Sequence, residues 1–195
     1  EMVARVIPPS RKDRTIGRPD AKAVVVVFGD YTEPNTKRVD DAVRALVAKN
    51  ELSVSYSYRH FPGDQSCNPG LPKTFFPVGC AAARGAEAAG VLGGPEAFWK
   101  MHAWLLSNRE RILSPAAVRE GAATLGIDPT KMEPIMGSAE VEKAVKEDVD
   151  AARQIGVGTI PCIYVNGKLV QRWSREGDNV LERIITEAAT GIPVK

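Results

Sequence analysis

Three cysteines are the residues of this sequence best suited to chemistry, because a thiolate is a nucleophile and two thiols can form a disulfide bond. Cys67 and Cys80 flank residues 68–72, which read Asn-Pro-Gly-Leu-Pro and are too rich in proline and glycine for regular structure. A bridge between the two would close this loop and stabilise the fold by about 3 kcal/mol. The alternative is two independent, partly buried thiols, since free cysteine packs like a small apolar residue. The loop context favours the bridge, which would imply an oxidising compartment.

The third thiol belongs to Cys162, which directly follows Pro161 at the start of a short apolar run. One thiol without a resolving partner could form mixed disulfides but could not complete an oxidase cycle. If the Glu33 carboxylate lies close to it, that charge would oppose formation of the thiolate. We therefore favour a buried strand cysteine that faces the core.

No metal site or cofactor is predicted from these residues. Neither Cys67 nor Cys80 belongs to a tight Cys-x-x-Cys pair, and the chain has 2 histidines, so a zinc site is disfavoured. His102 shares a helical face with Phe98, and we expect it to pack in the core. His60 follows a strand, and we expect it at the surface or anchoring a loop.

Composition narrows the class of protein. The chain has 195 residues, of which 44% are hydrophobic and 26% charged, and its formal net charge is +2. These values fit one globular domain, or a small domain with an insertion, and argue against a dedicated nucleic-acid binder. No apolar run approaches the roughly 18 residues of a membrane span, and the N-terminus lacks a signal-peptide pattern. We therefore expect any export signal or membrane tether to lie outside this chain.

The elements that must position these groups follow from hydrophobic periodicity. Residues 1–20 mix prolines with charges and predict an extended N-terminal arm before a domain over residues 21–195. Residues 23–28 form a continuous β-branched run, which is typical of a strand buried on both faces. A helix is expected from Pro34 to about residue 50, followed by a half-buried strand over residues 52–58. A strand-helix-strand unit of this length normally makes a right-handed parallel crossover.

A helical block is expected over about residues 79–156. Its first helix contains small residues and is expected to stop near Gly90 or at Gly93-Gly94. Further helices are expected around residues 98–105, from Ser114-Pro115, from Asp128-Pro129, and from Ser138 to Gly156.

The chain ends with a hairpin and a helix. Strands are expected at residues 162–165 and 168–172, joined by Asn166-Gly167, which is the strongest two-residue hairpin signal. An amphipathic helix carrying Val180 through Ala188 follows. The order strand-helix-strand, helical block, strand-strand-helix is that of an α/β protein with a thioredoxin-like sheet and a helical insertion.

From about residue 16 to residue 190, the chain resembles the DsbA-like thioredoxin-fold proteins. Five segments occur in the family's order: residues 17–21 (Gly-Arg-Pro-Asp-Ala), 27–31 (Val-Phe-Gly-Asp-Tyr), 59–62 (Arg-His-Phe-Pro), 98–102 (Phe-Trp-Lys-Met-His) and 156–161 (Gly-Val-Gly-Thr-Ile-Pro) before Val165-Asn166-Gly167. The resemblance implies that Pro161 is cis and that Thr159, Ile160 and Pro161 bind an extended peptide substrate.

The chain departs from the family at the site of catalysis. Where the family places Cys-x-x-Cys, between the first long strand and its helix, this sequence reads Glu33-Pro34-Asn35-Thr36. In the family the first cysteine is the nucleophile and the second resolves the mixed disulfide. Glu33 cannot exchange disulfides, although a carboxylate at a helix N-terminus is favourable. Thr36 could act as a hydroxyl donor to a bound thiolate, but an ordinary first-turn threonine is the simpler interpretation.

Three functions remain open, and whether the chain is an enzyme is undecided among them. The first is an exported or periplasmic domain without redox catalysis that binds an extended peptide or a partner protein. The second is residual thiol-disulfide chemistry through Cys162 or the Cys67/Cys80 pair. The third is glutathione-dependent transfer or isomerisation, by analogy with DsbA-like enzymes that carry serine at the first position. Glu33 disfavours this third function, because its charge would repel a glutathione thiolate.

Overall fold

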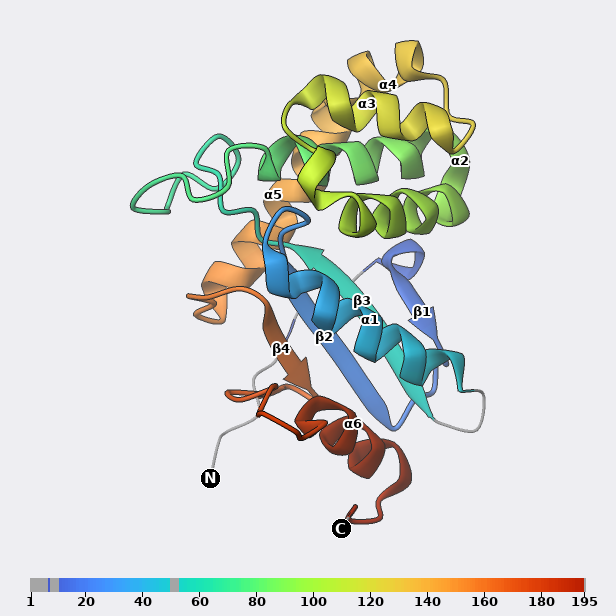
Figure 1. The fold of residues 1–195 in the computed structure, drawn as a ribbon, viewed down its shortest axis with the longest axis vertical. Helices are drawn as coiled ribbons and strands as arrows, with labels where there is room; N and C mark the ends of the chain where they lie inside the picture. The colour runs from blue at the N-terminus through green and yellow to red at the C-terminus, as the bar shows by residue number, and fades with distance from the viewer. Residues whose placement is uncertain (1–6, 8–10, 50–52, 195) are drawn as a thin grey trace.

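The computed structural model describes residue 7, residues 11–49 and residues 53–194, and it is built around one mixed five-stranded sheet (Figure 1). The strands are β1 (Thr15–Gly17), β2 (Ala23–Gly29), β3 (Val54–His60), β4 (Cys162–Val165) and β5 (Lys168–Leu169). Their spatial order is β1-β3-β2-β4-β5. Strands β2 and β3 are parallel, as the predicted crossover requires, and the other neighbours are antiparallel.

Prolines and polar caps begin most of the helices, as the sequence predicts. The helices are α1 (Pro34–Ala48), α2 (Gly79–Ser107), α3 (Pro115–Thr124), α4 (Pro129–Met136), α5 (Ala139–Gln154) and α6 (Val180–Thr190), with 3₁₀ turns η1 (Lys12–Arg14) and η2 (Arg109–Arg111). The side chains of Ser114, Asp128 and Ser138 each accept a backbone N–H at the start of α3, α4 and α5. Helix α2 breaks at Gly94, whose φ is 75°, and the chain turns back there to form the insertion (Figure 1).

The alternation of side chains along β2 divides the core between the two faces of the sheet. Val25 and Val27 point to the face that packs against α1 and α6 and belong to the larger apolar cluster, which extends into the insertion. Val26 and Phe28 point to the opposite face, where α5 covers them with Val145 and other apolar residues. The thioredoxin-like sheet with a helical insertion is therefore confirmed.

Three secondary-structure elements differ from the sequence-based expectations. Residues 11–17 are not an extended arm: they form η1 and then β1, which pairs with β3, while residues 1–6 and 8–10 lie outside the described part of the chain. Strand β3 is fully buried rather than half-buried, because it lies between β1 and β2 and carries helices on both faces. Strand β5 has 2 residues instead of the expected five-residue strand.

A buried ionic cluster fixes the N-terminal segment to the insertion. Glu87 of α2 accepts hydrogen bonds from Arg14 at 3.0 and 2.7 Å, and its Oε1 lies 2.9 Å from His60 Nε2. Burial favours the neutral form of Glu87, but the hydrogen bonds from His60 and Arg14 outweigh burial and hold the pKa of that carboxyl far below its usual range. His60 is 1% exposed, so the expectation of a surface position was wrong.

His102 lies in the core, as expected, and it has two polar partners there. Its Nε2 is 2.7 Å from Asp40 Oδ1, and its Nδ1 is 3.0 Å from the hydroxyl of Tyr31. Tyr31 directly precedes the turn that leads to Glu33, so this buried chain of hydrogen bonds holds one end of the turn against the insertion.

Candidate functional site

The turn that would carry a catalytic cysteine pair is closed by the Glu33 carboxylate. Glu33 is the N-cap of α1, and Pro34 occupies the first helical turn. Its oxygens accept the N–H groups of Asn35 at 2.9 Å and Thr36 at 2.7 Å, and the Thr36 hydroxyl donates a third bond at 2.8 Å. The side chain is 6% exposed. Glu33 therefore acts as a helix cap with both oxygens occupied.

Thr36 has no hydroxyl to offer a ligand. Its side chain is fully buried, and its Oγ1 is already bonded to Glu33 Oε2. The same oxygen lies 3.4 Å from the backbone nitrogen of Asp30. The residues at both cysteine positions thus bond to each other and to their own turn.

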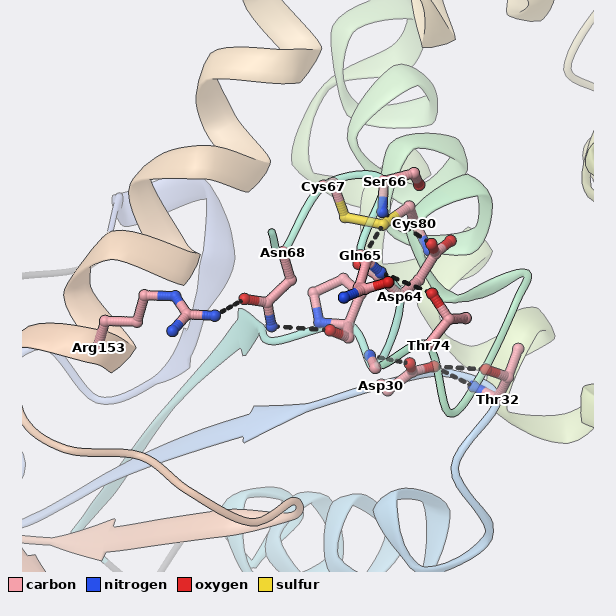
Figure 2. The surroundings of a disulfide bond; sticks show 12 residues. Asp30, Thr32, Asp64, Gln65, Ser66, Cys67, Asn68, Thr74, Cys80 and Arg153 are labelled. Atoms are coloured by element: carbon pink, nitrogen blue, oxygen red, sulfur yellow. Dashed lines mark hydrogen bonds between the residues drawn. A yellow bond between two sulfur atoms is a disulfide. The ribbon is translucent and has the colours of Figure 1, made fainter. Parts of the chain in front are cut away.

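Asp30 joins this turn to the loop that follows β3. Its Oδ1 accepts the N–H and the hydroxyl of Thr32 at 2.7 and 2.6 Å, and its Oδ2 accepts the N–H of Gly63 at 2.8 Å (Figure 2). Burial raises the pKa of the Asp30 carboxyl, although these hydrogen bonds act in the opposite direction. The bond to Thr32 is the local one that the sequence indicated, whereas the bond to Gly63 could not be inferred from spacing.

The segment before β4 presents a second, more open surface. The Ile160–Pro161 peptide bond is cis. Gly158 and Thr159 are exposed, and Ile160 is half-buried against the cluster under α5. Within the described chain, neither Thr159 nor Ile160 takes part in a backbone hydrogen bond outside the regular elements. The peptide groups of this segment are therefore not used by the backbone of the described chain.

Cys162 is the first residue of β4, pairs with Phe28 and lies in the core under α5. It is a free cysteine with a 7% exposed side chain. Burial raises the pKa of its thiol, and a hydrogen bond with Tyr164 offsets only part of this effect. The structure thus places Cys162 where it packs well and reacts poorly.

Cys67 and Cys80 are joined by a disulfide bond in the loop between β3 and α2 (Figure 2). Cys80 lies in the first turn of α2 and is 1% exposed, whereas Cys67 is half-buried. The carboxylate of Asp64 accepts the N–H groups of Ser66 at 2.9 Å and Cys80 at 3.4 Å. The N–H of Gly63, at the start of this loop, donates to Asp30 in the segment before α1. The disulfide loop and the turn at Glu33 are therefore neighbours.

Three further features of the described residues bear on binding. No cluster of three or more metal-ligating side chains occurs in residues 11–49 and 53–194. The helices in the same ranges are all too short or too polar to cross a membrane. Trp99 and Trp104 pack against the core, while Phe75 is 50% exposed on the disulfide loop beside Lys73, whose Nζ lies 5.2 Å from the ring centre.

Comparison with known proteins gives one family match and a mixed set of relatives. A family model described as the DSBA-like thioredoxin domain matches residues 24–184. The Na(+)/H(+) antiporter NhaA 3 of Salinispora tropica is 31% identical over 157 residues, which are 80% of this chain and 22% of the antiporter. The disulfide bond formation protein D of Bacillus subtilis is 23% identical over 188 residues, which are 92% of this chain and 79% of that protein. The chain thus spans about a quarter of the length of its antiporter relatives.

Solved structures show the same fold at low sequence identity. The oxidised BdbD of Bacillus subtilis matches with a TM-score of 0.73 at 21% identity, covering 98% of this chain and 100% of that one. The thiol-disulfide exchange protein α-DsbA2 of Wolbachia pipientis matches with a TM-score of 0.69 at 19% identity, covering 89% and 85%. The likeness extends over the sheet and the insertion together.

Proposed function

Because the chain belongs to the DSBA-like thioredoxin domain family, we propose that it keeps the family's binding surface without the cysteine-pair chemistry and binds an extended peptide or partner-protein segment at Thr159-Ile160-Pro161. The single observation that carries this proposal is the closed turn at Glu33. By the resemblance, Glu33 stands where the family has its nucleophile, and its carboxylate accepts three hydrogen bonds from its own turn.

The open segment before β4 supports the binding half of the proposal. An extended peptide can add to exposed backbone groups as a strand does, with main-chain hydrogen bonds giving affinity and side-chain contacts giving specificity. Thr159 and Ile160 offer such groups, and the half-buried side chain of Ile160 offers an apolar contact. We expect the ligand to be extended and to carry an apolar residue opposite Ile160.

The alternative of catalysis through Cys162 is less well supported. A free thiol must be exposed and readily ionised to exchange at a useful rate. Cys162 is buried, and burial raises its pKa. The alternative of glutathione-dependent transfer at Glu33 is disfavoured as well, because the Thr36 hydroxyl that would stabilise a thiolate is bonded to Glu33.

We further propose an exported location, close to a membrane protein. The disulfide between Cys67 and Cys80 is of the kind that persists in oxidising compartments. The antiporter relatives are membrane proteins by name, which favours a membrane tether or partner outside this chain. Labelling of native cells with a membrane-impermeant reagent, followed by recovery of this protein, would locate the domain.

Nuclear magnetic resonance titration tests the binding site. Isotope-labelled protein would be titrated with carboxymethylated α-lactalbumin, an unfolded chain whose cysteines are blocked. We expect amide shifts at Gly158, Thr159, Ile160 and Cys162, and a loss of binding in the variant Ile160→Lys. Leu113→Lys is the matched control, because Leu113 is 80% exposed on the insertion and its replacement adds the same charge.

Enzyme assays test the other half of the proposal. We expect insulin disulfide reduction by the wild type to stay at the rate of the buffer thiol. Turnover that disappears in Cys162→Ser would overturn the proposal in favour of residual thiol catalysis. Shifts that avoid residues 158–162 altogether would overturn the assignment of the peptide site.

A further inference from the structure

A hollow of about 450 Å³ lies between the disulfide loop and α5, away from the turn at Glu33. Its lining includes Cys67, Arg84 of α2, and Lys146 and Arg153 of α5. Figure 2 shows the Cys67 sulfur on the side of the disulfide that faces α5, with the Cys80 sulfur on the far side. The half of the disulfide that faces the hollow is therefore the more accessible half.

Cations outnumber anions around this hollow. Arg84, Lys146 and Arg153 face it together with Glu142 and Asp150. Lys146 and Asp150 pair with each other at 2.5 Å, whereas Arg84 has no ion-pair partner within residues 11–49 and 53–194. The hollow thus offers excess positive charge to a ligand, which raises the local concentration of anions.

Arg153 shapes one wall. Its guanidinium donates a hydrogen bond to Asn68 Oδ1, and a side chain at Gly70 would collide with that guanidinium. The disulfide loop therefore rests directly on α5, and the residues of the loop hold Cys67 at the edge of the hollow.

The surroundings of Cys80 suit a leaving group. Cys80 lies in the first turn of α2, where the helix dipole favours a thiolate, and Arg84 lies four residues further on, one turn along the same face. The carboxylate of Asp64, which accepts the Cys80 N–H, opposes this charge from the other side. Cys80 is also 1% exposed, and its Sγ lies 3.3 Å from the backbone oxygen of Asp64, so the released sulfur ends as a thiol that can donate to that oxygen.

We propose that the Cys67–Cys80 disulfide is a thiol-exchange site, and that the hollow binds a small acidic peptide thiol of the glutathione type. The thiolate attacks Cys67 Sγ, the Sγ–Sγ bond breaks, and its electron pair leaves on Cys80 Sγ, which takes a proton from water. A second thiolate attacks the sulfur of the bound thiol, releases Cys67 as a thiolate and forms the thiol's own disulfide. Two electrons pass from two peptide thiols to the protein disulfide, and the reverse sequence re-forms it. This site does not depend on the peptide-binding proposal, since it uses neither Glu33 nor Ile160.

Reaction of the intact, oxidised chain with three thiols of different charge tests the proposal. The native protein would be incubated with glutathione, 2-mercaptoethanol or cysteamine, quenched by alkylation and analysed by intact mass and peptide mapping. After correction for thiolate fraction, we expect glutathione to react about tenfold faster than cysteamine, because the hollow attracts anions. The mixed disulfide should map to Cys67.

The variants address the charge of the hollow directly. Arg84→Gln with Arg153→Gln should remove most of the preference for glutathione, whereas Arg109→Gln with Arg111→Gln, which changes net charge equally elsewhere, should keep it. Arg84→Gln alone should reduce the preference for glutathione in part. This single variant keeps Arg153 and its bond to Asn68, so it tests the charge even if the double variant loosens the loop. Equal rates for the three thiols, glutathione attached to Cys80, or no mixed disulfide without denaturant would each overturn the proposal.

Discussion

The start of α1 and the start of α2 are neighbouring helix N-termini that carry different side chains, a carboxylate at α1 and a disulfide sulfur at α2. At α1 the cap is a carboxylate, and the N–H groups of Asn35 and Thr36 and the Thr36 hydroxyl donate to it. At α2 the first turn holds a disulfide cysteine, and the cap residue Val78 makes no side-chain hydrogen bond. Asp30 lies close to both: its carboxylate binds the backbone of Thr32 before α1, and a side chain at Gly79, the first residue of α2, would collide with it.

The difference between the two helix starts shows that the same local fold can hold either a reactive or an unreactive group. A helix N-terminus stabilises any negative group, whether a thiolate that reacts or a carboxylate that does not. Glu33 therefore caps α1, as the dipole favours, but its carboxylate cannot itself exchange disulfides. The half-buried sulfur of Cys67 belongs to the neighbouring loop, next to the start of α2.

The largest expected effect is a gain of activity at α1. The double change Glu33→Cys with Thr36→Cys creates Cys-Pro-Asn-Cys at a helix N-terminus, where thiol pKa values fall well below that of free cysteine. We expect insulin reduction about tenfold or more above the wild type. Glu33→Ser with Thr36→Ser is the control. If the cysteine variant folds but stays inactive, two thiols at this turn are not enough for exchange.

Removal of the disulfide at α2 should be the largest loss of stability. Cys67→Ala with Cys80→Ala opens a loop whose cysteines are 13 residues apart, and the expected cost is about 3 kcal/mol. For a chain of this size, the melting temperature should fall by on the order of 10 °C. Calorimetry against Cys162→Ala, which removes a thiol but no bridge, measures it. An unchanged melting temperature would contradict the assignment of a stabilising bridge.

Removal of the carboxylate cap at α1 should cost less. Glu33→Ala leaves two backbone N–H groups and the Thr36 hydroxyl without an acceptor, and we expect a loss of about 1 kcal/mol in urea unfolding. Glu110→Ala, at an exposed position in η2, should be neutral. A neutral Glu33→Ala variant would mean that the turn does not need the cap.

Asp30 allows a pH test of the contact between the two regions. Burial raises its folded-state pKa above the unfolded value, so its contribution to stability is present below about pH 4 and is lost as pH rises through the folded-state pKa. Asp30→Asn removes this titration. The free energy of unfolding of the variant should therefore improve relative to the wild type as pH rises from 4 to 7. A constant difference over this range would argue against the raised pKa.

The smallest effect is expected at Cys162. Because its thiol is buried and hard to ionise, we expect no modification by iodoacetamide in the native state and complete modification in denaturant. Peptide mapping checks the site. Rapid labelling of the native protein would return Cys162 to the list of candidate nucleophiles.

Local signals explain how much of the fold the sequence could predict. The apolar run of β2, the proline starts of α1, α3 and α4, and the Asn166-Gly167 turn with φ values of 50° and 75° each depend on a few adjacent residues. The burial of β3 and His60 was missed because it depends on β1 and Glu87, which lie far away in the chain. No pattern within a short window could reveal those partners.

The same limit applies to the candidate site. The replacement at Glu33 and Thr36 and the cysteines at 67 and 80 are visible in the sequence, because each follows from residue type and position. The hydrogen bond from the Gly63 N–H to Asp30 joins residues 33 positions apart. The hollow beside Arg153 depends on the contact between Arg153 and Asn68, which are 85 positions apart. Residue spacing carried no information on either.

The two outer strands of the sheet have a consequence for behaviour at high concentration. Strand β1 has 3 residues and β5 has 2, so each border of the sheet leaves few backbone groups free to pair with another molecule. Short borders of this kind oppose strand-to-strand polymerisation between copies. We therefore expect concentrated solutions of the domain to be free of polymers joined through the edges of this sheet.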